Sequence, residues 1–392
     1  MVQRIGLVGC GVISDIYLRN AALFNDIRFT ACADMRPEAA EARAGQYGLR
    51  PMTLDELYAS SDVDIVLNLT NPEAHAAVSL RALDAGKHVY TEKPLATSRA
   101  DGEAIVMKAR ERGLQVGSAP DTILGPGLQT CRRMIDDGTV GPVISGVATI
   151  MSRGMEHWHP APAYYFQPGG GPVLDMGPYY IGALVTLLGP VSTVTAVGRV
   201  GLKERIVTAE GPNVGQRIPV EVPTTVHAVL CFESGAQVTL LASWDVWKHA
   251  HAPIELHGET ASLRVPDPNF FGGRIERAVD RDVWSGQDMA DRFYGRANYP
   301  AAKPIHANYR GLGLAEMARA IGDGRPPRVS GEWAFHILDV MLTILRSAEE
   351  GRSLAVASRC ERPAAMSDDE ALSLLAENPL RQAGQGSGER SR

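Results

Sequence analysis

The stretch Arg4–Ser14, RIGLVGCGVIS, decides the fold of the N-terminal part of the chain. It opens as a buried strand, and two glycines follow immediately before a helical pattern. A dinucleotide requires this geometry: one glycine permits a tight turn, the next lets the backbone approach a pyrophosphate, and the helix N-terminus presents unpaired N–H groups. The residues predicted to contact a dinucleotide here are Gly9, Gly11, Val12 and Ile13.

Asp34 supports this interpretation, because it ends the second strand pattern, RFTACAD. A carboxylate at this place accepts hydrogen bonds from the adenosine ribose hydroxyls and repels a 2′-phosphate, which favours NAD. Arg36 follows closely and is able to meet a 2′-phosphate instead, so NADP stays open as the cofactor. The alternative is a tight strand-to-helix turn that binds nothing, beside a surface aspartate.

Two domains are expected from the way strand and helix patterns follow one another. Through residue 122, strands that are apolar throughout alternate with helices, which indicates a doubly wound parallel sheet covered on both faces. Later strand patterns lack crossover helices, which indicates hairpins. We therefore predict an α/β protein with a Rossmann domain over residues 1–122 and an α+β domain over 123–365 that holds an open, largely antiparallel sheet. The late helices in 313–350 are able to pack back on the first domain, and the polar residues 376–392 are expected to be disordered.

Several elements of the second domain are predicted by their boundaries. A late helix over Glu332–Glu350, behind a Ser330 cap, carries an apolar stripe that we interpret as core. The strand patterns lie at Val143–Met151, Val194–Val200, Thr225–Phe232, Ala236–Ala242, Pro253–His257 and Ser262–Val265.

Composition excludes several classes of partner. The chain of 392 residues has a formal net charge of −6 and no Lys/Arg block, so we expect neither nucleic acid nor an anionic membrane as a partner. Five scattered cysteines without a CxxC pair indicate a reduced protein. No leader pattern and no long apolar run occur, so we predict a cytoplasmic protein.

The fourth strand pattern ends in a charged pair. HVYTEKPL places Glu92 and Lys93 at the carboxyl end of a strand, which is where open α/β sheets bind their ligands. A partly desolvated lysine beside a nicotinamide cation exchanges a proton or polarises a hydroxyl more readily. The alternative is a solvated lysine at a strand end.

A second candidate site lies in GGGPVLDMGPYY, from Gly169 to Tyr180. Asp175 and Tyr179 are four residues apart and so share one face of a helix, an arrangement suited to proton transfer. The preceding glycines are expected to leave room for a substrate. The alternative is structural, with Asp175 capping the helix and the tyrosines packed in the core.

Other polar and aromatic groups are weaker candidates. H-x-H pairs such as the one in EHWHP hold a metal only if a third ligand converges, so we predict no metal site. Histidines upstream of the glycine run and aromatic residues near it are better suited to sugar contact, although strand-edge packing explains the aromatic residues equally well. The predicted substrate contacts are His157, His159, Tyr180 and Trp244.

Four motifs together resemble a known family. GCGVIS, TNPEAH, AGKHVYTEKPL and GGGPVLDMGPYY, in this order and spacing, resemble the glucose–fructose oxidoreductase / inositol dehydrogenase / rhizopine catabolism (Gfo/Idh/MocA) family, and the likeness runs from Ile5 to about Arg352. The resemblance implies a Rossmann domain, a C-terminal open sheet that forms the oligomer interface, and NAD(P)-dependent chemistry on a sugar or cyclitol carbon. A homodimer or homotetramer through that sheet is therefore expected.

The resemblance also assigns residues. It implies that Lys93 and Asp175 match the family's active-site lysine and aspartate, and that the segment with Thr70, Asn71 and His75 lies along the cofactor. The chain departs from the family in two places: Tyr179 stands where many members carry histidine, and Gly182 stands where another aspartate is frequent. Tyr179 serves as the base if Lys93 and the oxidised nicotinamide stabilise its phenolate.

Three functions follow from these observations. The first is an NAD(P)-dependent oxidoreductase that moves hydride between nicotinamide and a carbinol carbon of a sugar, glycoside or cyclitol. The second is a redox-neutral glycoside hydrolase, in which transient oxidation at C3 permits elimination and is then reversed. The third is a non-catalytic nucleotide-binding sensor, which the retention of Lys93 disfavours.

Overall fold

The computed structural model describes residues 1–298 and 307–376, which cluster into two compact units. The first unit contains residues 1–124, 308–335 and the part of the chain from 363 onward. The second contains residues 125–307 and 336–362. The tail predicted to be disordered lies, from residue 377, outside the described residues. In the described part, no helix is both long enough and apolar enough to cross a membrane.

A parallel sheet of six strands forms the centre of the first unit, in the order β3-β2-β1-β4-β5-β6. Every neighbouring pair is parallel, and this order is that of dinucleotide-binding Rossmann domains. The sheet confirms the doubly wound prediction. Its strands are β1 (Gln3–Val8), β2 (Ile27–Ala33), β3 (Arg50–Pro51), β4 (Ile65–Asn68), β5 (His88–Thr91) and β6 (Val116–Ser118).

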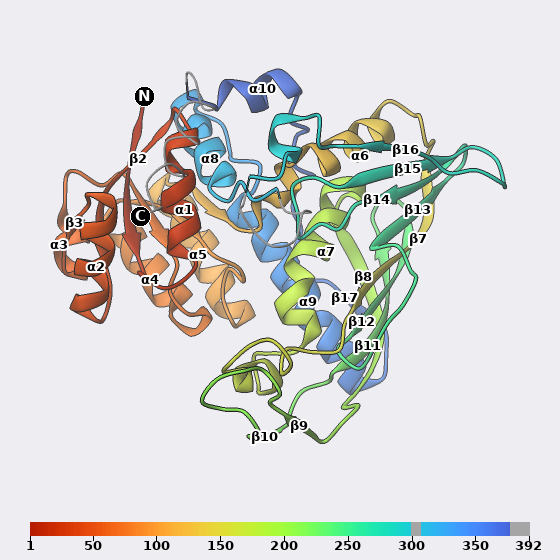
Figure 1. Cartoon of the computed structure of the whole chain (residues 1–392). Coiled ribbons are helices and arrows are strands. Elements are labelled where there is room, and N and C mark those ends of the chain that lie inside the picture. Colours follow the sequence, from red (N-terminus) through yellow and green to blue (C-terminus); the bar gives the residue numbers. More distant parts are fainter. Residues whose placement is uncertain (299–306, 377–392) are drawn as a thin grey trace, which may run out of the picture. The chain divides into compact units, whose positions relative to one another are not determined.

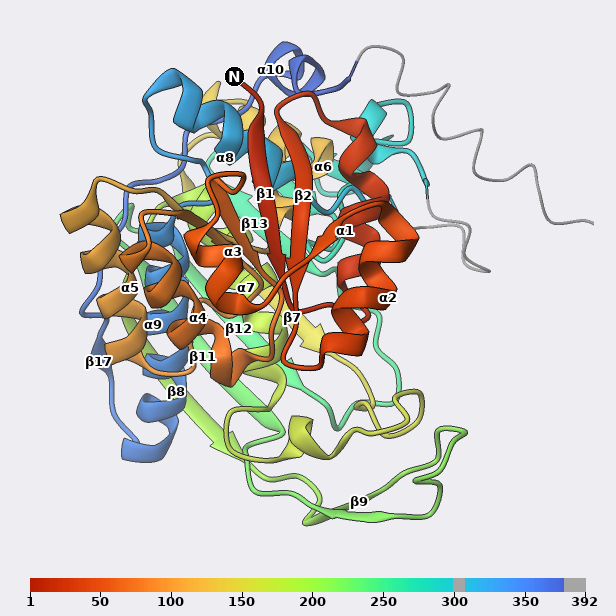
Figure 2. The same cartoon turned by 90° about the vertical axis from the view of Figure 1, so that its left-hand side faces the viewer.

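Helices flank this sheet on both sides, with α1 and α2 on one side of β1 and β2, and α4 and α5 on the other (Figure 2). Local signals set their ends: α2 begins with a proline in its first turn and ends at Gly48 in the left-handed conformation. The helices of the unit are α1 (Ser14–Asn20), α2 (Pro37–Tyr47), α3 (Leu54–Ala59), α4 (Pro72–Asp84), α5 (Arg99–Arg112), α8 (Leu312–Asp323) and α10 (Asp368–Ser373), with 3₁₀ turns η1 (Ala21–Leu23) and η2 (Asp121–Leu124).

A nine-stranded sheet forms the second unit, in the order β16-β15-β14-β13-β7-β12-β11-β8-β17 (Figure 1). Only β7 and β12 pair in parallel, which confirms the open, largely antiparallel prediction. The strands are β7 (Val143–Met151), β8 (Val191–Arg199), β11 (Thr225–Phe232), β12 (Gln237–Ser243), β13 (Ile254–Gly258), β14 (Ser262–Val265), β15 (Arg274–Ala278), β16 (Ser285–Asp288) and β17 (Leu354–Ala355). A separate two-stranded arm consists of β9 (Glu204–Ile206) and β10 (Arg217–Pro219).

Helices cover one face of the nine-stranded sheet. The stripe predicted on α9 is buried, because Trp333, Ile337, Val340, Met341 and Ile344 are each at most 3% exposed. The Ser330 hydroxyl accepts a 3.2 Å hydrogen bond from the Trp333 N–H, as its predicted cap role requires. The helices are α6 (Pro126–Asp136), α7 (Pro172–Leu188) and α9 (Gly331–Glu350), and the 3₁₀ turns are η3 (Ala163–Phe166) and η4 (Phe293–Gly295). The first residues of α9, through 335, cluster with the first unit.

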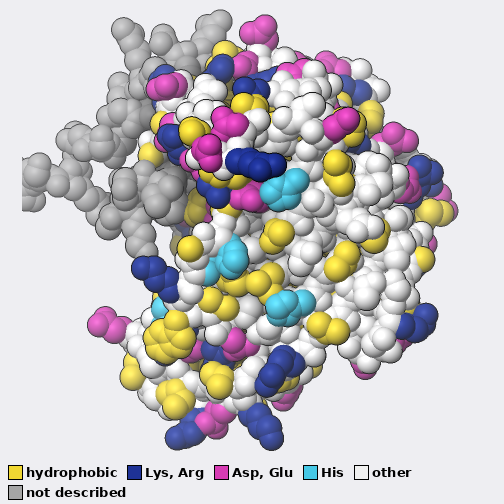
Figure 3. All heavy atoms as spheres, turned by 90° about the vertical axis from the view of Figure 1, so that its right-hand side faces the viewer, with side chains coloured by type: hydrophobic (Ala, Val, Ile, Leu, Met, Phe, Trp, Pro, Cys, Tyr) yellow, Lys and Arg dark blue, Asp and Glu magenta, His cyan; other side chains and the backbone are white. Residues whose placement is uncertain are grey.

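The opposite face of this sheet is open. Along β7, β8 and β11 the side chains on this face alternate with buried ones, and Val147, Val197 and Val229 are 39%, 64% and 39% exposed. Figure 3 views the molecule from this side and shows apolar and uncharged polar side chains in the middle, with charged ones mostly toward the edges. The row of Val147 continues on this face into Glu255, Arg264 and Glu276 of β13, β14 and β15, so the uncharged part lies over β7, β8, β11 and β12. An uncharged surface of this kind is typical of one that another protein chain covers.

Candidate active site

The glycine-rich turn after β1 has two glycines with different tasks. Gly9 has φ +95°, and a Cβ there would lie 2.7 Å from the backbone carbonyl carbon of Leu69. A Cβ on Gly11 would meet no atom within 4 Å. The first glycine is therefore required by the fold itself, whereas the second keeps an open surface free for a ligand.

Asp34 lies beside this turn, at the end of β2. One oxygen of its carboxylate accepts a 2.8 Å hydrogen bond from the Cys10 N–H, and the other accepts a 2.9 Å bond from the Arg36 N–H. The Arg36 guanidinium lies 3.8 Å from the same carboxylate and is largely solvated. Asp34 thus holds the turn in place while keeping lone pairs for the hydroxyls of a ribose.

Two apolar side chains at these strand ends have no packing partner that covers them. Val12 is 94% exposed in the turn and Met35 is 90% exposed directly after Asp34. A bound adenosine would cover such apolar surface while its ribose reached the carboxylate. The residues present therefore fit NAD, whose phosphates Gly11 and the start of α1 would hold.

His75 links the ends of two neighbouring strands. Its ring is 1% exposed, with Nδ1 2.7 Å from the Pro94 carbonyl oxygen and Nε2 3.0 Å from the Thr70 carbonyl oxygen. Thr70 follows β4 and Pro94 follows β5, so the imidazole joins the two segments predicted to face the cofactor. Asn71, by contrast, is exposed at the start of α4. The ring of His75 holds backbone in place, and Asn71 is the residue of this segment open to a ligand.

Glu92 organises the turn that carries Lys93. One carboxylate oxygen accepts a 2.9 Å hydrogen bond from the Tyr17 hydroxyl of α1, and the other accepts a 3.0 Å bond from the Lys93 N–H. Burial, together with the charge of Glu92, raises the pKa of Tyr17, so its phenol stays a donor. The backbone of Lys93 is therefore fixed by a buried tyrosine, while its side chain is partly exposed.

The second candidate site lies at the start of α7. Asp175 and Tyr179 sit one turn apart on this helix, as predicted. The Asp175 N–H bonds the Gly171 carbonyl oxygen at 3.1 Å, and Gly171, with φ +93°, is the N-cap. Gly171 and not Asp175 is therefore the N-cap residue, whereas Tyr180, at 5% exposed, is packed as the structural alternative expects. Tyr179 is 7% exposed, so its ring is packed.

The glycine run has a different purpose from the one that the sequence suggested. A Cβ on Gly170 would lie 2.4 Å from the Tyr165 carbonyl oxygen and 2.6 Å from that of Tyr164. Only Gly169 has open space around it, with no atom within 4 Å of its would-be Cβ. Gly170 therefore lets η3 pack against the helix start and does not make room for a substrate.

Tyr164 is a further candidate residue near the start of α7, one that the sequence analysis did not name. It is 54% exposed, and burial of its hydroxyl, the Tyr165 hydroxyl and the charge of Asp175 all raise its pKa. Its ring lies against that of Tyr165, with centroids 3.9 Å apart. The sequence signal was APAYYF, an aromatic pair just ahead of the glycine run.

The predicted substrate contacts fall into different environments. His159 packs its ring edgewise against Tyr165 at 5.4 Å and accepts a hydrogen bond from the Ala161 N–H, while His157 is exposed. The Tyr180 hydroxyl donates to Asp267 at 3.4 Å, and its burial raises its pKa. Trp244 is 1% exposed, in a small core with Phe166 and Met155. Of the four, only the two histidines present a ring edge to solvent.

The described residues contain no cluster of side chains that would support metal binding. Among the described residues, no group of three or more His, Cys, Asp or Glu side chains is arranged to hold a metal ion. His249 and His251, which form the other H-x-H pair, stack on each other with ring centroids 6.0 Å apart.

Comparison with known proteins settles the family. Residues 3–119 match the oxidoreductase family with an NAD-binding Rossmann fold, and residues 128–264 match the GFO/IDH/MocA C-terminal domain. Inositol 2-dehydrogenase of Rhizobium meliloti (strain 1021) is 31% identical over 361 residues, which cover 91% of this chain and all of that protein. The chain belongs to the Gfo/Idh/MocA family. Its first unit is thus an NAD-binding Rossmann domain.

Two further proteins are similar to this chain, one in sequence and one in fold. Levoglucosan dehydrogenase of Pseudarthrobacter phenanthrenivorans (strain DSM 18606 / JCM 16027 / LMG 23796 / Sphe3) is 26% identical over 302 residues, which cover 71% of this chain and 73% of that protein. The crystal structure of an NAD binding oxidoreductase from Klebsiella pneumoniae superposes with a TM-score of 0.78 at 21% identity, covering 91% of this chain and all of that one. The second similarity concerns the fold alone.

Proposed function

We propose that the protein is an NAD-dependent dehydrogenase or reductase of a sugar, glycoside or cyclitol, acting at a carbinol carbon. The relatives named inositol 2-dehydrogenase and levoglucosan dehydrogenase support a polyhydroxylated substrate. The observation that carries the proposal is the pair Asp175 and Tyr179 on one turn of α7, in a chain whose Lys93 is held by Glu92 at a strand end. NAD, when bound, accepts the hydride from the substrate carbon.

Each residue has a distinct chemical role in this proposal. Hydride leaves a carbinol carbon only as its hydroxyl proton is removed, so a base must lie at that oxygen. Tyr179 as its phenolate takes this proton and becomes a phenol. The Lys93 ammonium stabilises the phenolate before the step and the partial negative charge on the substrate oxygen during it. Asp175 accepts hydrogen bonds from neighbouring substrate hydroxyls and orients the ring, with His157 and His159 as further contacts.

NAD is the proposed cofactor in preference to NADP. The charge of Asp34 repels a 2′-phosphate, and its carboxylate lies 3.8 Å from the Arg36 guanidinium and so offsets part of the charge that would attract one. We also propose action in the cytoplasm, which the absence of a disulfide among the five cysteines, all of them in the described part, supports.

The open face of the nine-stranded sheet is the proposed interface of a homodimer or homotetramer. Its cross-strand rows pair Val197 with His227 and Val229 with Thr239, so the part of the surface over β8, β11 and β12 carries no formal charge. Light scattering of Val229→Lys against the unchanged protein tests this, because a buried lysine would dissociate the oligomer. An unaltered mass would place the interface elsewhere.

The function is tested with NAD and a panel of aldoses, glycosides and cyclitols, monitoring NADH absorbance and free aglycone together. NADH formation is expected, and Lys93→Met and Tyr179→Phe should each lower kcat/KM by a factor of about 10² to 10⁴. Lys108→Met, which removes a surface lysine paired with Asp84, is the matched control. Aglycone release without NADH would replace this proposal by the redox-neutral hydrolase. Full activity of Lys93→Met would remove Lys93 from the chemistry.

A further inference from the structure

A negative charge lies close to the turn that is expected to hold the cofactor. In an NAD-binding Rossmann domain the diphosphate lies against the glycine-rich turn, which here runs from Gly9 to Ile13. The N–H groups of Val12 and Ile13 have no hydrogen-bond partner among the described residues, so they are available to phosphate oxygens. Asp15 follows two residues later, and its carboxylate would repel the same phosphates.

Arg43 of α2 compensates for this charge. Its Nη1 lies 3.3 Å from the Asp15 carboxylate, and Arg19 of α1 pairs with the other carboxylate oxygen at 3.2 Å. The Tyr47 hydroxyl also donates to Asp15 but brings no charge, because burial and this carboxylate raise its pKa to about 12. The side chain of Arg19 is 49% exposed and that of Arg43 only 16%, so solvent and salt screen Arg43 less.

The same guanidinium also holds the backbone of the turn. Arg43 Nη2 donates a 3.2 Å hydrogen bond to the Gly11 carbonyl oxygen, which accepts a 2.6 Å bond from the Ser14 hydroxyl as well. No atom lies within 4 Å of the place that a Cβ would take on Gly11, so bonds to its carbonyl oxygen, and not side-chain packing, restrain this peptide. One side chain of α2 therefore links the position of the turn to the charge beside it.

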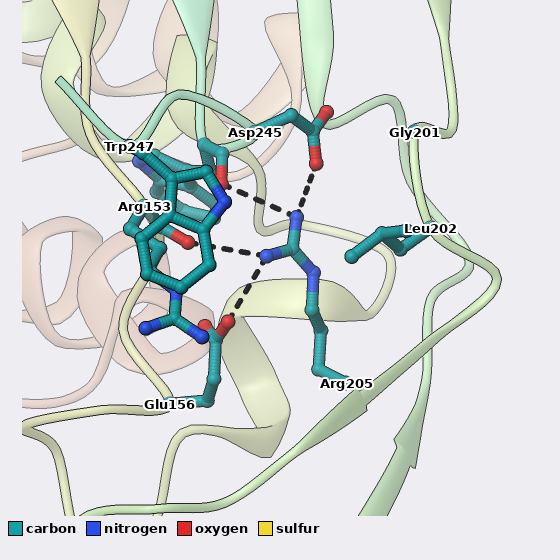
Figure 4. A pocket seen from close by; sticks show the side chains of 8 residues that line it. Arg153, Glu156, Gly201, Leu202, Arg205, Asp245 and Trp247 are labelled. Atoms are coloured by element: carbon teal, nitrogen blue, oxygen red, sulfur yellow. Dashed lines mark hydrogen bonds and ion pairs between the residues drawn. The ribbon is translucent and has the colours of Figure 1, made fainter.

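An arginine that serves the fold alone has different surroundings. In the second unit, Arg205 lines a pocket of about 270 Å³ (Figure 4). Its terminal nitrogens donate to Glu156 at 3.0 Å and to the carboxylate of Asp245. With a side chain that is only 3% exposed, Arg205 joins the β9–β10 arm to the loops after β7 and β12. Arg43 is less buried and bonds the turn expected to face the cofactor, so its loss should affect binding.

From these contacts we propose that Arg43 positions the glycine-rich turn for the diphosphate of NAD. Its guanidinium offsets the charge of Asp15 and fixes the Gly11 peptide, which leaves the next two N–H groups able to bind phosphate without a repelling charge nearby. Arg43 lies on α2, outside the glycine-rich motif, and acts through the turn. The inference concerns NAD binding alone, so it does not depend on the substrate proposed above.

Binding of cofactor fragments by the full chain tests the inference without turnover. ADP-ribose carries the diphosphate and adenosine lacks it, so only ADP-ribose should depend on Arg43. In calorimetric titrations, Arg43→Gln should bind ADP-ribose about tenfold more weakly and leave the affinity for adenosine unchanged. Arg50→Gln is the matched control, because it removes a surface ion pair with Asp62 at 3.3 Å in the same unit and should change neither affinity.

Asp15→Asn separates the effect of charge from the effect of structure. Asparagine keeps an acceptor for its neighbours and removes the negative charge, so this variant should bind ADP-ribose at least as tightly as the unchanged protein. Combined with Arg43→Gln, it should recover a large part of the lost affinity, because no unpaired carboxylate then lies beside the turn. Thermal unfolding of each variant without cofactor shows whether it is folded.

Three results would overturn the inference. The first is an ADP-ribose affinity of Arg43→Gln equal to that of the unchanged protein. The second is an equal weakening of ADP-ribose and adenosine, which would mean that Arg43 supports the fold and not the diphosphate. The third is weaker ADP-ribose binding by Asp15→Asn, or no recovery in the double variant. NADH formation from a sugar by the unchanged protein is measured separately, so the proposed function stands or fails independently.

Discussion

The carboxylate of Asp34 accepts a 2.8 Å hydrogen bond from the backbone N–H of Cys10, within the glycine-rich turn. One side chain therefore both supports the turn and sets the charge that a ribose or a 2′-phosphate meets. These two roles can be separated, because asparagine retains one acceptor oxygen for the Cys10 N–H and loses the charge, at the cost of the bond from the Arg36 N–H.

Asp34→Asn should therefore change the cofactor preference without unfolding the turn. Loss of the negative charge, with Arg36 released from its ion pair, should lower the KM for NADP and raise the KM for NAD, shifting the ratio of the two by about tenfold or more. Steady-state kinetics with both cofactors measure this ratio. Asp34→Ala, which also removes the acceptor, should cost stability in addition. An unchanged ratio in the asparagine variant would show that charge at this position does not select the cofactor.

The two glycines of the turn should respond differently to alanine. In Gly9→Ala the new Cβ would lie 2.7 Å from the Leu69 backbone at a φ of +95°, so several kcal/mol of stability should be lost. In Gly11→Ala the new Cβ enters open space, so the thermal midpoint should stay within a few degrees while NAD affinity falls. Thermal unfolding and cofactor titration of both variants check this. Normal NAD binding by Gly11→Ala would mean that the pyrophosphate does not approach that backbone.

Tyr17→Phe should expose the positioning role of this tyrosine. The variant leaves one oxygen of Glu92 without its 2.9 Å donor, which should cost about 1 kcal/mol of stability and loosen the turn that holds Lys93. We expect kcat to fall several-fold with little change in the sugar KM, a split that a purely structural defect would not produce. Tyr47→Phe, which removes a comparable phenol–carboxylate bond to Asp15, is the control. Equal effects in both variants would contradict the role.

His336 should make stability depend on pH. Its ring is buried, its Nε2 accepts a 3.0 Å hydrogen bond from the Val191 N–H, and its Nδ1 lies 3.0 Å from the Ser358 hydroxyl. Desolvation lowers its pKa to about 4, against the opposing charges of Asp339 and Glu233. As the pH falls, the unfolded chain therefore takes up the proton before the folded one does. The contribution of neutral His336 to the free energy of unfolding is complete above pH 6.5. It is lost as the pH falls toward 4, by up to about 3 kcal/mol.

Urea unfolding at several pH values between 7.5 and 4.5 measures this loss. His336→Gln keeps an acceptor for Val191 but cannot take up the proton, so its free energy of unfolding should vary less over the same interval. The difference between the two pH profiles isolates the histidine from the carboxylates that titrate nearby. Parallel profiles would assign the acid sensitivity to other groups.

Much of the fold was predictable because its strands carry strong patterns. Thr225–Phe232 alternates buried and exposed side chains, and its predicted ends match β11. Elements without such patterns were missed. β3 has only two residues, both exposed, and all four residues of β16 are exposed polar or glycine residues, so neither carries an apolar signal. These strands exist because an established neighbour supplies the hydrogen bonds, which is a tertiary effect.

The candidate site was predictable to a lesser degree. Lys93 and Asp175 lie in motifs with a strong local signature, whereas the aromatic residues proposed to contact a sugar do not. Within one stretch, SWDVWKH, the sequence analysis predicted Trp244 as a substrate contact and did not name Trp247. Trp244 continues the buried face of β12, while Trp247 comes after the strand has ended. Alternation no longer applies there, so the sequence pattern cannot assign a face.

The first unit consists of segments that are separated in the sequence, and this affects how the protein folds during synthesis and where it can be truncated. Its sheet is built from residues up to 118, yet Phe24 pairs with Leu375, and the Asp121 carboxylate accepts bonds from Gly311 and Gly313 at the start of α8. The two segments of the second unit, residues 125–307 and 336–362, are thus two insertions in the sequence of the first unit. The ribosome must synthesise nearly the whole chain before the first unit can fold completely. A fragment that ends at residue 124 would lack the contacts from α8 and the C-terminal segment, so it would not fold as an independent cofactor-binding domain.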